Sequence, residues 1–155
     1  ELVTDGGGAG RHRGALAVRK DVTLHADVTF SNLMDRSDTP PPGLFEGRPG
    51  VPARAYIDPE DGETRELHPK GTYGLDSGTT VSLQACGAGG YGDPIEADPE
   101  DVLADVRRGF VSVSAAREEY HVEVTDENGR LELDRDATER LRRGDSDQTE
   151  ASREG

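Results

Sequence analysis

Arg11, His12 and Arg13 form the one compact cationic cluster of the sequence that is flanked by glycines, with Gly10 before it and Gly14 after it. Two guanidinium groups and an imidazole this close together are suited to bind a carboxylate or a phosphate through charge-assisted hydrogen bonds. The alternative is that the arginines form ion pairs with the many acidic residues of the chain, as surface arginines commonly do. The cluster is therefore our candidate contact for a substrate or another anion, with ordinary ion pairing as the alternative.

Other residues that carry out chemistry are sparse. The histidines are scattered at His12, His25, His68 and His121, and none of them has the helical spacing or the cysteine partners of a common metal site. The single cysteine, Cys86, ends an apolar stretch with no histidine near it in the sequence, so we expect it to be buried and inert. We predict no metal site in this chain, and its catalytic residues stay unknown.

Two glycine-rich segments, residues 6–10 and 87–94, have the composition of a phosphate cradle. The first precedes a strand-like stretch, whereas a phosphate cradle needs a helix N-terminus behind it. The second does precede a predicted helix, but Asp93, Glu96 and Asp98 stand between its glycines and that helix and would repel a phosphate. Neither segment has the Lys-Ser/Thr ending of a P-loop, so structural turns are favoured over nucleotide binding.

The second glycine segment is predicted to be a structural motif. Glycine adopts positive φ at little steric cost, and this segment lies where a strand-rich half of the chain gives way to a helical half. We therefore expect it to turn the chain from sheet to helix. The residues of the motif are Gly87, Gly89, Gly90, Tyr91, Gly92 and Asp93.

The first half of the chain alternates polar and apolar residues, which predicts strands. Residues 15–30 are expected to form one long bent strand or two joined strands, and the proline-rich residues 39–50 a rigid loop. This half is predicted to be all β, as a sandwich or a barrel-like sheet. Its shorter strands are expected at residues 53–57, 64–67, 71–75 and 79–85.

The second half shows helix signals. Asp98 is a favoured N-cap and Pro99 stands at a favoured first helical position, so a helix is predicted to begin there. Ser112 or Ser114 is expected to cap a second short helix over residues 115–120.

An Asn-Gly pair at residues 128–129 predicts a hairpin between residues 121–125 and 130–133. A last helix is expected over residues 136–143, anchored by Leu141. The fold class is therefore predicted as α+β, with a β-rich N-terminal half followed by short helices and a small hairpin.

Three regions follow from these patterns. Residues 1–94 are predicted to be β-rich, and residues 95–143 to form a small helical and hairpin region packed on them. Residues 144–155 are polar and charged without an apolar period, so we expect a disordered acidic tail.

The formal net charge of the chain is −14, and only Lys20 and Lys70 are lysines among its 18 basic residues. An acidic, lysine-poor surface is typical of proteins adapted to high salt, so a halophilic origin is favoured over an ordinary acidic protein. This charge argues against nucleic acid as a partner. We also see no membrane span and no signal peptide, and one cysteine suits a reducing cytoplasm. Because the chain begins at Glu1 without a methionine, we expect a fragment or a processed product.

In order and spacing, several segments of the chain resemble the C-terminal segment of hydantoinase B. That family also includes the corresponding part of 5-oxoprolinase and of the acetone carboxylase large subunit. The resemblance extends over residues 1–143, although Ala15, Ala17 and Ala88 stand where the family tends to have glycine. The matching segments are residues 5–16, 42–50, 70–72, 87–94, 98–102 and 111–122.

The resemblance implies part of an ATP-dependent amidohydrolase that opens a cyclic imide or lactam, such as N-methylhydantoin or 5-oxoproline. In such enzymes a hydantoinase A-type subunit holds ATP with Mg²⁺ and activates the ring carbonyl by phosphorylation. A divalent metal is used by some members, and we expect no cofactor in this segment itself. The implied partners are the A-type subunit and the missing upstream part of the B-type subunit, in an oligomeric enzyme. This chain alone is then expected to be inactive.

Two alternatives stay open from the sequence. One is a non-catalytic structural or interaction module of a multisubunit complex. The other is a part of an acetone carboxylase-like enzyme.

Overall fold

The computed structural model describes residues 1–58 and 63–144 of the 155-residue chain. The tail predicted for residues 144–155 lies outside the described residues except for Gly144.

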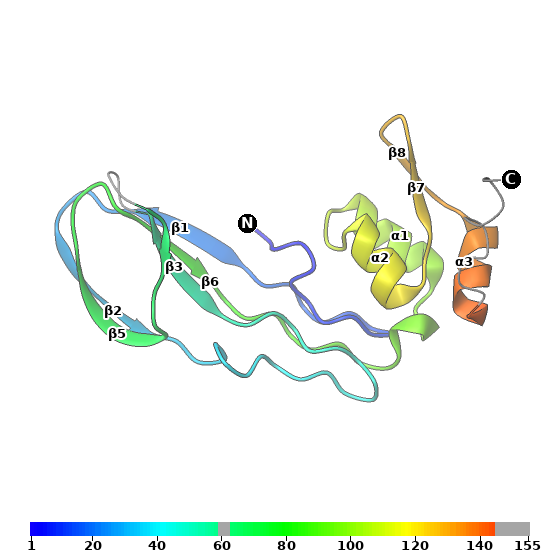
Figure 1. Cartoon of the computed structure of the whole chain (residues 1–155), viewed down its shortest axis with the longest axis horizontal. Coiled ribbons are helices and arrows are strands. Elements are labelled where there is room, and N and C mark those ends of the chain that lie inside the picture. The colour runs from blue at the N-terminus through cyan, green and yellow to red at the C-terminus, as the bar shows by residue number, and fades with distance from the viewer. Residues whose placement is uncertain (59–62, 145–155) are drawn as a thin grey trace, which may run out of the picture.

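The strands of the first half form two antiparallel sheets (Figure 1). The expected stretch at residues 15–30 is two strands, and they belong to different sheets. One sheet has the order β1-β6-β3-β4, with β1 (Arg19–Thr23), β6 (Thr80–Gln84), β3 (Arg54–Asp58) and β4 (Arg65–Glu66). The other pairs β2 (Val28–Leu33) with β5 (Lys70–Leu75).

The two sheets share one apolar core. Because side chains alternate across a strand, β3 directs Ala55 and Ile57 to the same face, and both are buried. Leu75 of β5 and Val81 of β6 complete this cluster together with Leu67. The two sheets therefore pack face to face, and the β-rich prediction for this half is confirmed.

The second half contains three α-helices and a strand pair. Asp98 and Pro99 begin the first helix as predicted, because the Asp98 side chain accepts from the Glu100 amide at 2.9 Å. Ser112 caps the second helix through the Ala115 amide. The elements of this half are η1 (Pro94–Glu96), α1 (Pro99–Arg107), α2 (Val113–Tyr120), β7 (Val124–Glu127), β8 (Arg130–Leu133) and α3 (Arg135–Arg143).

The hairpin between β7 and β8 turns through Asn128 and Gly129, which have φ of 57° and 82°, as an Asn-Gly turn requires. In α3 the most buried residue is Thr138, whose hydroxyl accepts from the Glu123 amide at 3.0 Å. Leu141, the expected anchor, is only half-buried. The α+β class is confirmed.

Between the sheets and the helices lies a bundle of extended segments that are neither helix nor strand (Figure 1). We call residues 5–17, 40–52 and 86–92 the glycine bundle. Each of the first two segments folds back on itself, which gives two extended arms per segment and four arms in all. Residues 86–92 run between these arms.

Backbone hydrogen bonds join residues 86–92 to every arm. The Gly8 amide donates to the Ala88 carbonyl, and the Ala88 amide donates to the Ala15 carbonyl, both at 2.9 Å. On the other side, the Gly90 amide donates to the Arg48 carbonyl and the Gly90 carbonyl accepts from Leu44, again at 2.9 Å. One extended chain is therefore surrounded by four neighbours.

Glycine makes this arrangement possible because the backbones approach too closely for side chains. A Cβ atom added at Gly87 would lie 1.6 Å from the Gly6 carbonyl oxygen. At Gly90 it would lie 2.0 Å from the oxygen of Ala9. At Gly89, between them, it would lie 2.0 Å from the oxygen of Pro42.

The reason predicted for this motif is wrong for most of its glycines. We expected positive φ, but within residues 86–92 only Gly92 has it, at 78°. Gly87, Gly89 and Gly90 are instead required by close backbone contacts. Ala88, which interrupts the run, is exposed, so its methyl group has room.

We predict that Gly87→Ala lowers the free energy of unfolding by about 3 kcal/mol or more, because the added methyl group overlaps a carbonyl that cannot move alone. Gly74→Ala is the matched control, since a Cβ atom at Gly74 meets nothing within 4 Å. It should change stability by less than about 1 kcal/mol. Urea unfolding of both variants measures this, and equal stabilities would contradict the bundle.

Candidate functional site

Arg13, from the predicted cationic cluster, links the glycine bundle to α1. Its Nε donates to Oδ2 of Asp105 at 2.7 Å, and its Nη1 donates to the Gly14 carbonyl at 2.8 Å. The guanidinium also lies over the Phe110 ring, 5.4 Å from the ring centre. Both side chains of the ion pair are only 20% exposed. Arg13 is therefore already bound within the protein.

Arg11 and His12 have different partners from Arg13. Arg11 Nη1 lies 3.7 Å from a carboxylate oxygen of Glu96 in η1, and its side chain is 59% exposed. The His12 ring centre is 6.2 Å from that of Tyr91, and the backbones of these two residues exchange two hydrogen bonds of 2.9 Å. The acidic partners favour the ion-pair alternative for the arginines. An anion contact at Arg11, His12 and Arg13 stays a prediction.

These residues border an open cavity of about 390 Å³ between the bundle and α1. Its lining includes the guanidinium groups of Arg11, Arg13 and Arg108 and the carboxylates of Asp101 and Asp105. The two carboxylates offset most of this positive charge, which weakens the attraction of the cavity for an anion.

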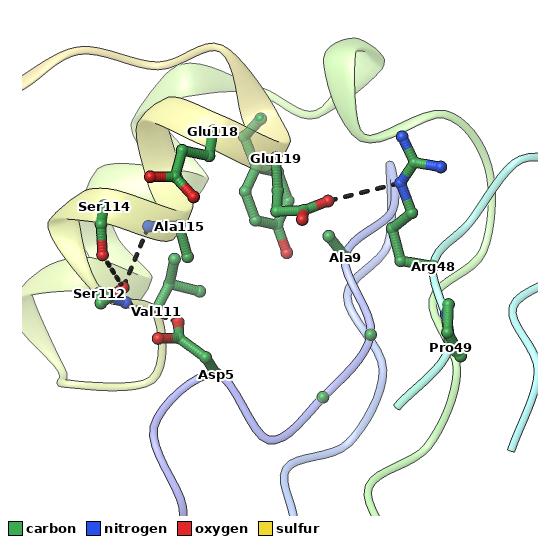
Figure 2. A pocket seen from close by; sticks show the side chains of 13 residues that line it. Asp5, Ala9, Arg48, Pro49, Val111, Ser112, Ser114, Ala115, Glu118 and Glu119 are labelled. Carbon is green, nitrogen blue, oxygen red and sulfur yellow. Dashed lines mark hydrogen bonds and ion pairs between the residues drawn. The ribbon is translucent and has the colours of Figure 1, made fainter. Parts of the chain in front are cut away.

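A second cavity, of about 280 Å³, lies between the glycine bundle and α2 (Figure 2). Asp5, Glu118 and Glu119 contribute carboxylates to it, and Arg48 contributes one guanidinium. The sequence did not predict it, because its lining comes from segments about a hundred residues apart. The one sequence signal for this cavity was Asp5, which directly precedes the first glycine segment.

The polar groups of the second cavity are largely engaged with one another. The Asp5 carboxylate accepts from the Ser112 amide at 2.8 Å, and the Ser112 and Ser114 hydroxyl oxygens are 3.0 Å apart. Arg48 Nε lies 3.4 Å from a Glu119 carboxylate oxygen (Figure 2). Carboxylates here can accept from N–H groups and would repel phosphate, so the cavity suits a neutral amide better than an anion.

Tyr120 separates the two cavities and lines both of them. Its side chain is buried, with 4% of the residue exposed. Burial raises the pKa of the Tyr120 hydroxyl to about 12, and the nearby Asp105 carboxylate adds to this against the opposing effect of Arg13. At neutral pH the group is therefore a neutral hydroxyl and cannot serve as a base.

The remaining chemistry-bearing residues lie apart. Cys86 is a free thiol and half-buried, rather than fully buried as predicted. The polar contacts of the His68 ring are local, since its Nδ1 lies 3.0 Å from the Lys70 carbonyl oxygen and 3.2 Å from the Lys70 amide nitrogen. Within residues 1–58 and 63–144, no group of three or more His, Cys, Asp or Glu side chains is placed to hold a metal ion. None of the helices in the same ranges is long and apolar enough to cross a membrane.

Comparison with known proteins adds a family and several relatives. The family described as Hydantoinase B/oxoprolinase matches residues 1–94. A Pseudomonas sp. protein, named as the putative B subunit of a D-/L-hydantoinase, is 34% identical over 147 residues, covering 92% of this chain and 24% of that protein. The beta subunit of the Pseudomonas jessenii caprolactamase is 34% identical over 139 residues, covering 84% of this chain and 23% of that subunit.

Two solved structures are also similar to this chain. The crystal structure of the ATP-dependent caprolactamase from Pseudomonas jessenii matches with a TM-score of 0.77 and 29% identity, over 92% of this chain and 25% of that chain. Nucleotide-free acetone carboxylase matches with a TM-score of 0.73 over 93% of this chain and 24% of that chain; its 20% identity shows a shared fold alone. The chain spans about a quarter of the length of the curated relatives it matches.

Arg13→Ala is predicted to lower the free energy of unfolding by about 1–3 kcal/mol, because it leaves the partly buried Asp105 carboxylate without its donor. Arg11→Ala is the matched control, since its ion pair is long and exposed, and should change stability by less than about 0.5 kcal/mol. Urea unfolding at neutral pH measures both. An Arg13→Ala variant as stable as the parent would show that Arg13 does not hold the bundle to α1.

Tyr120 makes stability depend on alkaline pH. In the unfolded chain its hydroxyl ionises near its ordinary pKa, whereas in the folded chain the pKa is about 12, so ionisation favours unfolding. This contribution is complete below about pH 10 and is lost as the pH rises towards about 12. Tyr120→Phe should show a shallower loss of stability over that range than the parent chain. Identical pH profiles of unfolding would refute the burial of this hydroxyl.

Proposed function

This chain belongs to the hydantoinase B/oxoprolinase family, and from that premise we propose that it is part of the B-type subunit of an ATP-dependent enzyme that opens cyclic amides. The observation that carries the proposal is the 34% identity to the B subunit of the D-/L-hydantoinase over 92% of this chain. The beta subunit of the caprolactamase supports it independently. Hydantoin is a cyclic imide and caprolactam a lactam, so ring amides are the common substrate class.

In this proposal the reaction begins with transfer of the γ-phosphoryl group of ATP, held with Mg²⁺ on an A-type subunit, to the oxygen of the ring amide. Water then attacks the activated carbon, the ring C–N bond breaks and phosphate leaves. The net reaction consumes ATP and water and yields ADP, phosphate and the open-chain acid. Phosphorylation is the step that the amide needs, because an unactivated amide has a poor leaving group.

The contribution of this chain is structural, with at most one wall of the site. Arg13 is held by Asp105, and at the second cavity the Asp5 and Glu119 carboxylates already have partners. We therefore assign the residues that perform catalysis and bind any metal to the remainder of the B-type polypeptide. The neutral Tyr120 hydroxyl and the Glu118 carboxylate are the groups of this chain suited to hold a ring amide, the hydroxyl by donating to its C=O and the carboxylate by accepting from its N–H.

A pure assembly module is the second candidate, and the occupied side chain of Arg13 favours it. A carboxylase is less well supported than a hydrolase, because the likeness to acetone carboxylase concerns the fold alone.

The test uses the B-type polypeptide that carries this chain, purified together with an A-type subunit. The complex is expected to hydrolyse ATP in step with the opening of N-methylhydantoin, 5-oxoproline or caprolactam. The 155-residue chain alone should do neither. Coupled ADP release and chromatography of the open-chain acid measure both activities. A complex that never couples ATP hydrolysis to any such ring would sink the proposal.

Arg11→Ala in the same complex separates the two candidates, because this variant leaves the fold intact. We expect kcat/KM to change by less than about twofold, since Arg11 is exposed and paired with Glu96. A loss of about tenfold or more would instead assign Arg11 to substrate binding and exclude a pure assembly module.

A further inference from the structure

At the end of the glycine bundle away from the sheets lies an exposed apolar cluster, formed by Leu44, Phe45 and Tyr91, which we call the aromatic tip. Phe45 is 72% exposed, Leu44 59% and Tyr91 49%. The rings of Phe45 and Tyr91 meet edge to face, with their centres 5.1 Å apart. Large apolar side chains gathered in this way on a soluble surface mark an interaction site.

The backbone holds Phe45 outward in an unfavourable conformation. Phe45 and Glu46 both have left-handed φ, of 50° and 73°, which bulky residues with a Cβ atom rarely adopt. Hydrogen bonds on either side of the turn enforce it. The Leu44 amide donates to the Gly90 carbonyl, and the Leu44 carbonyl accepts from Gly92, both at 2.9 Å.

The backbone beneath the aromatic tip, at Tyr91 and Gly47, is also held in place. Tyr91 exchanges two backbone hydrogen bonds with His12, and a Cβ atom at Gly47 would lie 2.2 Å from the Gly90 oxygen. The tip is thus ordered before any partner binds, which lowers the entropy that binding must overcome. A strained turn that exposes an aromatic ring does not stabilise this chain by itself.

The net charge of the chain and the length of its relatives indicate which partner binds the aromatic tip. A second copy of this chain is disfavoured, because two chains of net charge −14 repel, and Glu46 adds an acidic group next to Phe45. The relatives carry about three quarters of their length outside the matched region, on the same polypeptide. Leu44, Phe45 and Tyr91 all lie within the residues that match the family.

We propose that the aromatic tip docks into an apolar pocket with a basic rim on the remaining part of the B-type subunit. The tip then anchors this chain to the part of the subunit to which we assign catalysis. This inference rests on the proposed function only for the source of its partner.

Hydroxyl-radical footprinting tests the docking. The oxidation rates of Phe45 and Leu44 are compared in the 155-residue chain, in the complete B-type subunit and in its complex with the A-type subunit. We expect a several-fold fall in the complete B-type subunit without the A-type subunit. Leu33, 83% exposed on β2, is the internal control and should keep its rate.

Each other outcome overturns the proposal. Protection that appears only with the A-type subunit would assign the tip to that subunit, and protection in the isolated chain that grows with concentration would assign it to a second copy. Unchanged oxidation in all samples would mean that nothing docks there. Ring opening by a complex whose tip stays exposed would support the proposed function and contradict the docking. A protected tip in a complex that opens no ring would support the docking and contradict the proposed function.

A variant adds a second readout. Phe45→Asn relieves the left-handed backbone, since asparagine tolerates this region, and should leave the Tm of the isolated chain unchanged or raised. In the complete B-type subunit it should lower the Tm by several degrees, because the pocket loses its ring. Leu33→Thr is the matched control and should change neither Tm. Equal shifts of Phe45→Asn in both contexts would overturn the proposal.

Discussion

The close approach of backbones in the glycine bundle is the constraint on which the rest of this structure depends. Residues 86–92 lie among four extended arms, at distances where a single methyl group at Gly87 or Gly90 would overlap a carbonyl oxygen. Such packing buries little apolar surface, so its stability comes from backbone hydrogen bonds between segments far apart in the sequence. It also explains how a chain with 32% hydrophobic residues and few aromatic residues forms an ordered fold. Two modest apolar cores lie on either side of the bundle and add to its stability.

The bundle also determines how the two halves of the chain meet. Ala9, at the end of its first arm, belongs to the core of the helical half, and Arg13 reaches Asp105 of α1. Asp5 receives the Ser112 amide at the start of α2. Both cavities are bordered by these contacts, and the tip that carries Phe45 is the turn of another arm. The glycine bundle therefore positions both cavities and the aromatic tip.

Local signals predicted the fold well where the structure is local. The caps at Asp98 and Ser112 and the turn at Asn128-Gly129 lie where the sequence placed them, because each depends on neighbouring residues. The sequence could not reveal that Gly87, Gly89 and Gly90 serve backbone contact rather than positive φ, since their neighbours come from residues 6–9 and 42–43. The partner of Arg13 stands 92 residues away, so the sequence offered ion pairing as an alternative without identifying Asp105 as the partner. The second cavity was missed for the same reason.

Hydrogen exchange at the amides of residues 86–92 tests the bundle most directly. The account predicts that the Ala88, Gly90 and Tyr91 amides, although in neither helix nor strand, exchange as slowly as the amides of β6 and α1, because all open only with global unfolding. Exchange at the fast rate of an ordinary surface loop would contradict it.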